Sequence, residues 1–314
     1  MYKPKIIAVV GPTSSGKSAL GVFLAKKLGG EIISADSRQV YRGLDIGTGK
    51  VTKREMRGIP HHLLDVANPK KQFSADDFVK RAKEVLGDLI YQVTPKIPIV
   101  VGGTGFYVDA LLGRLTLPDV PPDPALRARL EKQSAAKLFT QLKKLDPARA
   151  KTIEPKHKRR LIRAIEIAIY KRRRKTTLSE GKTWPSGPER PSGGSFLAPR
   201  YEILWLGLNP GEKKLKKNIH IRLFARIRAG MIEEARRLHK NGLSYKRMEE
   251  LGLEYRYLAW YLRGDIDRHA LETQLEREIQ KYAKRQMRWF KRNSEIRWVK
   301  NKTEALRLSK KFLS

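Results

Sequence analysis

The first third of the chain alternates short apolar runs with longer amphipathic segments. The apolar runs are rich in β-branched residues and too short for a helix, which is typical of buried strands. They cover residues 6–10, 31–35 and 97–101. The amphipathic segment at 18–28 separates the first two runs and carries leucines at helical spacing. Strand, helix and strand in this order predict a parallel βαβ unit, so we expect an α/β fold whose parallel sheet is flanked by helices.

Two further elements fit this pattern. A helix is predicted from Ser74, a typical N-cap with Asp77 three residues later, to about residue 92. Residues 60–66 read as a short strand that contains His61 and His62. Neighbours on a strand point to opposite faces, and no further ligand has suitable spacing, so we interpret these histidines as structural rather than metal-binding.

The alternation stops after residue 112. Prolines at 117–124 mark a boundary, and the sequence up to residue 170 is helical and basic, with leucines on apolar faces. Residues 181–198 are rich in Gly, Pro and Ser, which predicts a flexible loop. An apolar strand returns at 201–208. We therefore predict a catalytic domain formed by residues 1–112 and 201–314, with a mainly helical insertion at 113–200.

The rest of the chain is predicted to be helical. One apolar face is expected to pack on the sheet; its residues are Ile219, Leu223, Ile227, Met231 and Leu238.

A glycine loop between the first strand and the first helix fits the pattern G-x-x-x-x-G-K-[ST] without a mismatch. It consists of Gly11, Pro12, Thr13, Ser14, Ser15, Gly16, Lys17 and Ser18. Glycines let backbone N–H groups turn inward, and the helix N-terminus adds a positive dipole end, so the loop predicts a di- or triphosphate site. Lys17 would hold the outer phosphates and Ser18 would ligate Mg²⁺. The loop predicts a ligand but not a reaction.

Two polar residues follow predicted strands. Asp36 comes just after the strand at 31–35, and Thr104 follows the strand at 97–101 in a second glycine turn. Because ligands bind outside the carboxyl ends of parallel strands, Asp36 is a candidate base or metal-sphere ligand, and Thr104 could donate a hydrogen bond to a phosphate. Capping of a turn by Asp36 and of a helix by Thr104 remain alternatives.

The charge balance points to a polyanionic partner. The 314 residues include 67 Lys and Arg against 32 Asp and Glu, a net charge of +35. Such an excess attracts nucleic acid, although a generally basic surface is an alternative interpretation. The absence of cysteine excludes disulfides, zinc fingers and thiol catalysis, and no apolar stretch is long enough to span a membrane. We expect a soluble cytoplasmic protein.

Taken together, four blocks closely resemble the tRNA dimethylallyltransferases, also called tRNA isopentenyl transferases. The blocks are residues 11–18, 34–48, 61–65 and 101–107. The resemblance implies a P-loop NTPase-like fold and transfer of a dimethylallyl group from dimethylallyl diphosphate to N6 of adenosine 37, beside the tRNA anticodon. It also implies Mg²⁺ as cofactor, the anticodon stem-loop as partner, and a phosphate loop that binds the prenyl diphosphate, so that ATP need not be used. We expect a monomer.

The resemblance assigns roles to particular residues. Asp36 would be the base, and Thr104 and Arg222 would hold the diphosphate. The positions similar to tRNA-binding positions of the family are Asp36, Ser37, Arg38, Gln39, Thr104, Arg127, Arg159, Arg160, Leu161, Ile162, Arg163, Arg285 and Gln286. The chain departs from the family pattern at four positions, Arg159 for Gln, Asn218 for Arg, Phe224 for Asp, and Glu254.

Other functions remain open from the residues alone. An adenylate isopentenyltransferase or a P-loop kinase would also need the phosphate loop, but would leave the basic insertion without a purpose. A non-catalytic or ATP-driven RNA-binding protein would not require Asp36 and Thr104 beside the loop.

Overall fold

A computed structural model of the chain describes residues 3–179 and 201–314. The chain forms two compact units. Unit 1 contains the residues up to Thr116 and the described residues from Tyr201 onward, and unit 2 begins at Leu117, with its described part ending at Ser179. The sequence placed the first boundary four residues earlier, between 112 and 113. The loop predicted at 181–198 lies outside the described residues.

Unit 1 is built on a parallel six-stranded sheet with the strand order β3-β2-β4-β1-β5-β6. The strands are β1 (Lys5–Val10), β2 (Gly30–Ser34), β3 (His61–His62), β4 (Ile97–Gly102), β5 (Glu202–Gly207) and β6 (Arg297–Trp298). This confirms the α/β prediction. Strand β6 contradicts the expectation that the C-terminal part is entirely helical; its two exposed residues show no apolar run that could have predicted a strand.

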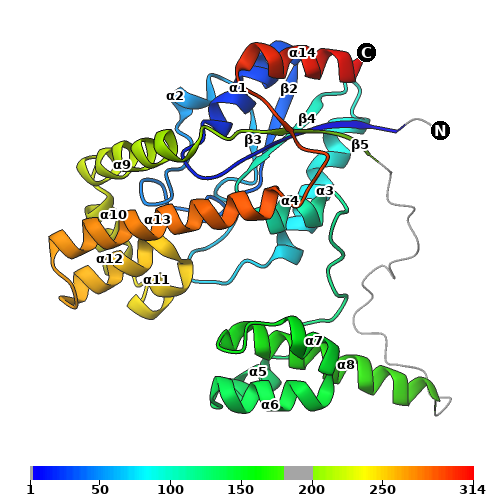
Figure 1. Ribbon diagram of the computed structural model, residues 1–314, viewed down its shortest axis with the longest axis vertical. Coiled ribbons are helices and arrows are strands. Elements are labelled where there is room, and N and C mark those ends of the chain that lie inside the picture. Colours follow the sequence, from blue (N-terminus) through cyan, green and yellow to red (C-terminus); the bar gives the residue numbers. More distant parts are fainter. Residues whose placement is uncertain (1–2, 180–200) are drawn as a thin grey trace. The chain divides into compact units, whose positions relative to one another are not determined.

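Helices cover both faces of this sheet (Figure 1). On one face, α1 (Lys17–Leu28) and α14 (Lys302–Leu313) share a core with β1, β2 and β4. On the other face, α3 (Ala75–Tyr91) and α4 (Gly105–Leu111) pack around Phe78 and Tyr107, whose rings stack 4.3 Å apart. Ser74 and Asp77 form the capping box expected at the start of α3. The short helix α2 (Lys53–Met56) lies in the connection from β2 to β3.

The helices between β5 and β6 form a separate layer. They are α9 (Glu212–Arg228), α10 (Met231–Lys240), α11 (Tyr245–Leu251), α12 (Leu253–Arg263) and α13 (Arg268–Phe290). The apolar face predicted at 219–238 packs here against α12, α13 and residues 40–44, so the expectation that it covers the sheet is wrong. It is also split into two helices, because Gly230 adopts a left-handed conformation (φ 95°) between them.

Unit 2 is a four-helix unit in its described part. Its helices are α5 (Pro124–Glu131), α6 (Ala135–Leu145), α7 (Pro147–Thr152) and α8 (Lys158–Ser179). Its core consists mainly of leucine and isoleucine side chains and includes Leu130, Leu138, Leu142, Leu161 and Ile165. Within residues 3–179 and 201–314, no helix has the length and apolar character to cross a membrane.

Candidate functional site

The phosphate loop connects β1 to α1 in a conformation that its glycines permit. Gly16 has φ 91°, and a Cβ on Gly11 would lie 2.8 Å from the carbonyl oxygen of Leu208. Ser14 takes a left-handed conformation as well, with φ 60°, and its carbonyl accepts a hydrogen bond from Asn218 Nδ2 at 3.1 Å. Asn218, one of the departures from the family pattern, therefore helps to hold the loop from α9.

Lys17 lies at the start of α1 and faces the interior of the loop. Its Nζ donates to the carbonyl of Pro12 at 3.2 Å. Burial lowers the pKa of Lys17 to about 8; Asp36 opposes this shift and Arg222 adds to it. A phosphate group beside this ammonium would stabilise its charged form, so the loop is built for an anion.

Gln286 ties the two glycine turns together. This buried α13 residue donates to the carbonyl of Gly103 at 2.8 Å and accepts from the N–H of Thr13 at 2.8 Å. The sequence predicted Gln286 as a tRNA contact. In the structure its amide links the phosphate loop to the turn that precedes Thr104, and the residue also lines the cavity described below.

Asp36 and Thr104 come together as the strand ends predict. Asp36 Oδ1 caps its own turn by accepting from the N–H groups of Arg38 (2.9 Å) and Gln39 (3.3 Å). Thr104 Oγ1 accepts from the N–H of Ser37 at 3.1 Å and makes no side-chain cap to α4. The capping interpretation is thus right for Asp36, and Thr104 stands at the N-cap position of α4, although its hydroxyl does not cap the helix. Asp36 still has a second carboxylate oxygen for a ligand.

These elements enclose a cavity of about 340 Å³. Its lining includes residues from the phosphate loop, the turn after β2 and the helical layer: Thr13, Lys17, Ser18, Asp36, Ser37, Arg38, Gln39, Arg222, Tyr282, Arg285 and Gln286. Apolar side chains of Ile32, Val51, Val101, Leu253 and Ile279 line it as well, and the other lining residues include Glu254 and Arg256. The cavity therefore combines a cationic phosphate site, a carboxylate and an apolar wall.

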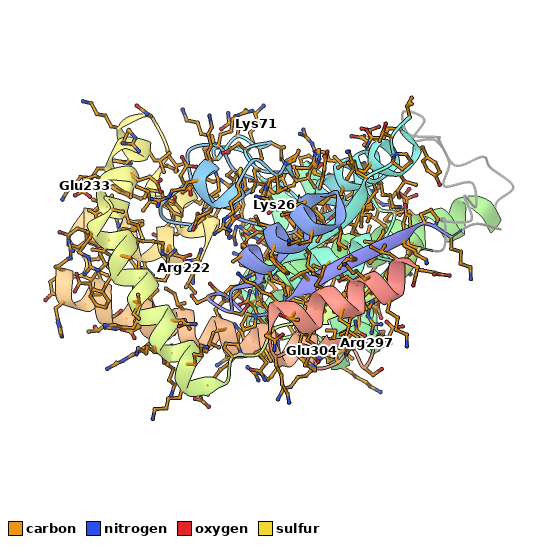
Figure 2. All side chains as sticks on the ribbon, turned by 90° about the horizontal axis from the view of Figure 1, so that it is seen from above. Lys26, Lys71, Arg222, Glu233, Arg297 and Glu304 are labelled. Atoms are coloured by element: carbon orange, nitrogen blue, oxygen red, sulfur yellow. The ribbon has the colours of Figure 1, made fainter. Side chains whose placement is uncertain are left out.

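Arg222 reaches this cavity from α9. Figure 2 shows it between the helical layer and the phosphate-loop side of the sheet. Its Nη2 donates to the carbonyl of Gly49 at 2.8 Å, and Gln39 Nε2 donates to the same carbonyl at 3.3 Å. On the same helix, Arg226 bonds to Gly47 O at 2.7 Å and pairs with Glu254 at 3.2 Å. The departure at Glu254 thus places a carboxylate in the cavity lining, where it pairs with Arg226.

Helix α13 contributes an aromatic ring and a cation to the cavity lining. Arg285 lies over the Tyr282 ring, 5.8 Å from its centroid, and both line the cavity. Burial raises the pKa of Tyr282 to about 12, so its hydroxyl stays protonated at neutral pH. One turn further, Trp289 donates to Asp109 at 2.8 Å and packs against Gly105.

In unit 2, the predicted tRNA contacts fall into three groups. Arg159 and Arg160 are exposed at the start of α8, whereas Leu161 and Ile162 have their side chains in the core. Arg127 and Arg163 both bind the carboxylate of Glu166, which is 2% exposed. Burial would raise the pKa of Glu166, but hydrogen bonds from Arg127, the Asp123 backbone and Arg163 outweigh it and lower the pKa.

The donor set of the cavity fits a magnesium ion held mainly by phosphate oxygens. Ser18 and Asp36 both supply oxygens beside the phosphate loop. No cluster of three or more His, Cys, Asp or Glu side chains suited to a metal occurs in the described parts of the chain. Magnesium commonly binds through one or two protein oxygens, substrate phosphates and water, whereas a caged metal needs more protein ligands. His61 and His62 instead bond to Ile59 O (2.8 Å) and Glu31 (2.7 Å).

Sequence reasoning missed the buried Glu234 of α10. Its carboxylate accepts hydrogen bonds from three consecutive backbone N–H groups at 45–47 and from the Tyr255 hydroxyl. The signal was present in the spacing, because Glu234 lies three residues after Met231 and beside Ala235 on the apolar face of the helix.

Comparisons with known proteins agree with this geometry. Residues 39–293 match the family described as IPP transferase. The chain is 39% identical over 307 residues to tRNA dimethylallyltransferase 2 of Citrifermentans bemidjiense, covering 96% of this chain and 93% of that protein.

Two solved structures are similar over most of the chain. The full-length tRNA isopentenylpyrophosphate transferase of Bacillus halodurans has a TM-score of 0.69 at 32% identity, covering 99% of this chain and 96% of that chain. A eukaryotic dimethylallyltransferase, captured in snapshots of its action on tRNA, has a TM-score of 0.71 at 25% identity, covering 91% of this chain and 70% of that chain. The P-loop NTPase-like fold expected from the sequence agrees with these neighbours.

Proposed function

The chain belongs to the IPP transferase family, and we propose that it transfers the dimethylallyl group of dimethylallyl diphosphate to N6 of adenosine 37 in tRNA. The observation that carries the proposal is the single cavity in which the phosphate loop, Asp36 and Arg222 meet. A diphosphate donor and an amine acceptor need such a site, because the donor's leaving group and the acceptor's proton must be handled on opposite sides of one carbon.

Each bond change of the transfer can be assigned to groups in the cavity. Adenine N6 attacks C1 of the donor, the C1–O bond breaks, and the diphosphate leaves with the bonding electron pair. The proton of N6 passes to the free carboxylate oxygen of Asp36. Lys17 and the phosphate-loop N–H groups hold the charge that develops on the diphosphate, and Arg222 contacts it from α9. Ser18 and the phosphates would hold a magnesium ion, which would neutralise part of that charge.

The acceptor base must leave the anticodon loop to reach the cavity. Extrusion costs stacking energy, which the site offsets by contacts to the flipped base and the surrounding strand. Gln39 and Arg38 lie at the cavity wall and would contact the vacated space, and Arg285 over Tyr282 offers a cation beside an aromatic ring. Arg159 and Arg160 of unit 2 would contact tRNA phosphates. Thr104, bonded to the Ser37 backbone, would hold the turn that carries Asp36.

The alternatives predict different acceptors. A small-molecule prenyltransferase or a kinase needs neither unit 2 nor the charge of +35. We propose that the enzyme works as a monomer in the cytoplasm, where unmodified tRNA is present, and that ATP is not consumed.

The test is incubation with labelled dimethylallyl diphosphate, Mg²⁺ and unmodified tRNA, with AMP and ATP as parallel acceptors. Nucleoside mass analysis should find the label in N6-prenyladenosine from tRNA alone. Label on AMP or ATP would replace the proposal by the small-molecule alternative. ATP hydrolysis without prenyl transfer would favour an RNA-binding ATPase.

A further inference from the structure

The Asp45–Lys50 loop carries part of the family resemblance but has no role in the reaction described above. It is held by Glu234, whose side chain is buried to 1% exposure. Glu234 Oε2 accepts from the N–H groups of Asp45 (3.0 Å) and Ile46 (2.8 Å). Glu234 Oε1 accepts from the N–H of Gly47 (2.9 Å) and from the Tyr255 hydroxyl (2.6 Å).

Such a carboxylate fixes the loop backbone. Burying an ionised carboxylate is costly unless its oxygens are fully hydrogen-bonded, and here each oxygen accepts two bonds. Gly47 is required for this close approach, because a Cβ there would lie 2.7 Å from the Tyr255 hydroxyl oxygen. Three consecutive N–H groups aimed at one side chain leave the loop little freedom to shift.

The other end of the loop reaches the cavity. The Gly49 carbonyl accepts from Arg222 Nη2 at 2.8 Å, and Arg226 Nη1 donates to the Gly47 carbonyl at 2.7 Å. A Cβ on Gly49 would lie 2.8 Å from Arg222 Nη2, so loop and guanidinium are in close contact. A displacement of the loop must therefore displace Arg222.

We propose that Glu234 is a positioning residue that sets the affinity for the prenyl diphosphate. By fixing residues 45–47 it fixes the Gly49 carbonyl, and this carbonyl orients Arg222 toward the phosphate loop. The inference rests on the proposed function, which assigns Arg222 to the diphosphate. Neither Glu234 nor Tyr255 lines the cavity, so both act through the loop.

Glu234→Gln tests the proposal with little change in volume. The new amide keeps the oxygen that serves Asp45 and Ile46 and turns its NH₂ toward Tyr255, whose oxygen can accept. The Gly47 N–H is then left without an acceptor, next to Thr48 and Gly49. We expect the KM for dimethylallyl diphosphate to rise about tenfold, while the KM for tRNA stays within about twofold.

The matched control is Glu233→Gln on the same helix. Glu233 is exposed, and Figure 2 shows it at the outer edge of the helical layer. This variant should behave as wild type. If Glu234 were merely structural, its loss would lower the fraction of active enzyme, so kcat would fall with both KM values unchanged. That result, or an unchanged donor KM, would overturn the proposal.

A double variant tests whether Glu234 acts through Arg222. In Arg222→Ala enzyme, adding Glu234→Gln should not raise the donor KM further, and an additive increase would contradict this route. If Glu234→Gln does not fold, Tyr255→Phe decides: it removes one of the four bonds, and the donor KM should rise about threefold. An unchanged donor KM in Tyr255→Phe would refute the proposal. Wild-type enzyme that fails to prenylate tRNA would instead refute the proposed function.

Discussion

Replacing Arg127 by Gln should destabilise unit 2 without weakening its phosphate contacts. The Glu166 carboxylate accepts four hydrogen bonds, two from Arg127 at 2.8 Å, one from the Asp123 N–H at 2.7 Å, and one from Arg163. Arg163 also donates to the Val120 carbonyl at 2.8 Å. The arginines thus tie α8 to α5 and to the segment that enters it.

The magnitude follows from what remains around Glu166. Removing the partner of a buried carboxylate costs about 3–5 kcal/mol when the charge is left alone. Arg163 and the Asp123 N–H stay in place, so we expect the free energy of unfolding to fall by about 2 kcal/mol. The control is Arg129→Gln, an exposed arginine of the same helix, which should change stability by less than about 0.5 kcal/mol.

Denaturant unfolding and tRNA binding at several salt concentrations check the prediction. Each phosphate contact adds about 0.7–0.9 to the slope of log K against log salt. Arg127→Gln should leave the slope unchanged, whereas Arg160→Gln, on the exposed start of α8, should reduce it by that amount with stability intact. If Arg127→Gln keeps full stability but reduces the slope of log K against log salt by that amount, Arg127 is a phosphate contact and the reasoning is wrong.

Four further outcomes are expected. With the pKa of Lys17 near 8, affinity for inorganic diphosphate, measured by calorimetry, should fall about tenfold per pH unit above pH 8. The same lowered pKa means that the buried ammonium reduces the free energy of unfolding below pH 8, and this cost disappears as pH rises toward 10.5. Asp36→Asn keeps the acceptor that caps its turn, so kcat should drop at least about 100-fold with tRNA affinity nearly unchanged; equal losses would exclude a base. Gly49→Ala should raise the donor KM by pushing Arg222 aside, unlike an exposed Gly113→Ala. Gln286→Leu removes the hydrogen bonds that link Thr13 to Gly103, so single-turnover transfer should slow with tRNA affinity retained. Weaker tRNA binding would instead support the prediction that Gln286 contacts tRNA.

The parts of the site that follow strand ends were predictable. The phosphate loop and Asp36 come directly after strands, and parallel topology alone brings their positions to one edge of the sheet. Contacts between helices were not predictable in the same way. The periodicity at Ile219 and Leu223 shows that one face is buried but does not say against what, and it packs on α12 and α13 rather than the sheet. Arg163 illustrates the same limit, because a cation on a helix reads as solvent-facing until its buried partner is known.

Buried acidic side chains hold arginines in fixed positions in this strongly cationic chain. Cations needed for a polyanionic partner repel one another, so an excess of +35 works against holding two arginines at fixed positions. In the described residues, the buried acidic side chains are Glu166 and Glu234. Glu166 brings Arg127 and Arg163 together, and Glu234 fixes the loop whose carbonyl receives Arg222. Each carboxylate thus holds arginines in place, directly or through backbone, and neither occupies the phosphate-binding surface, where its charge would weaken the binding of an anion.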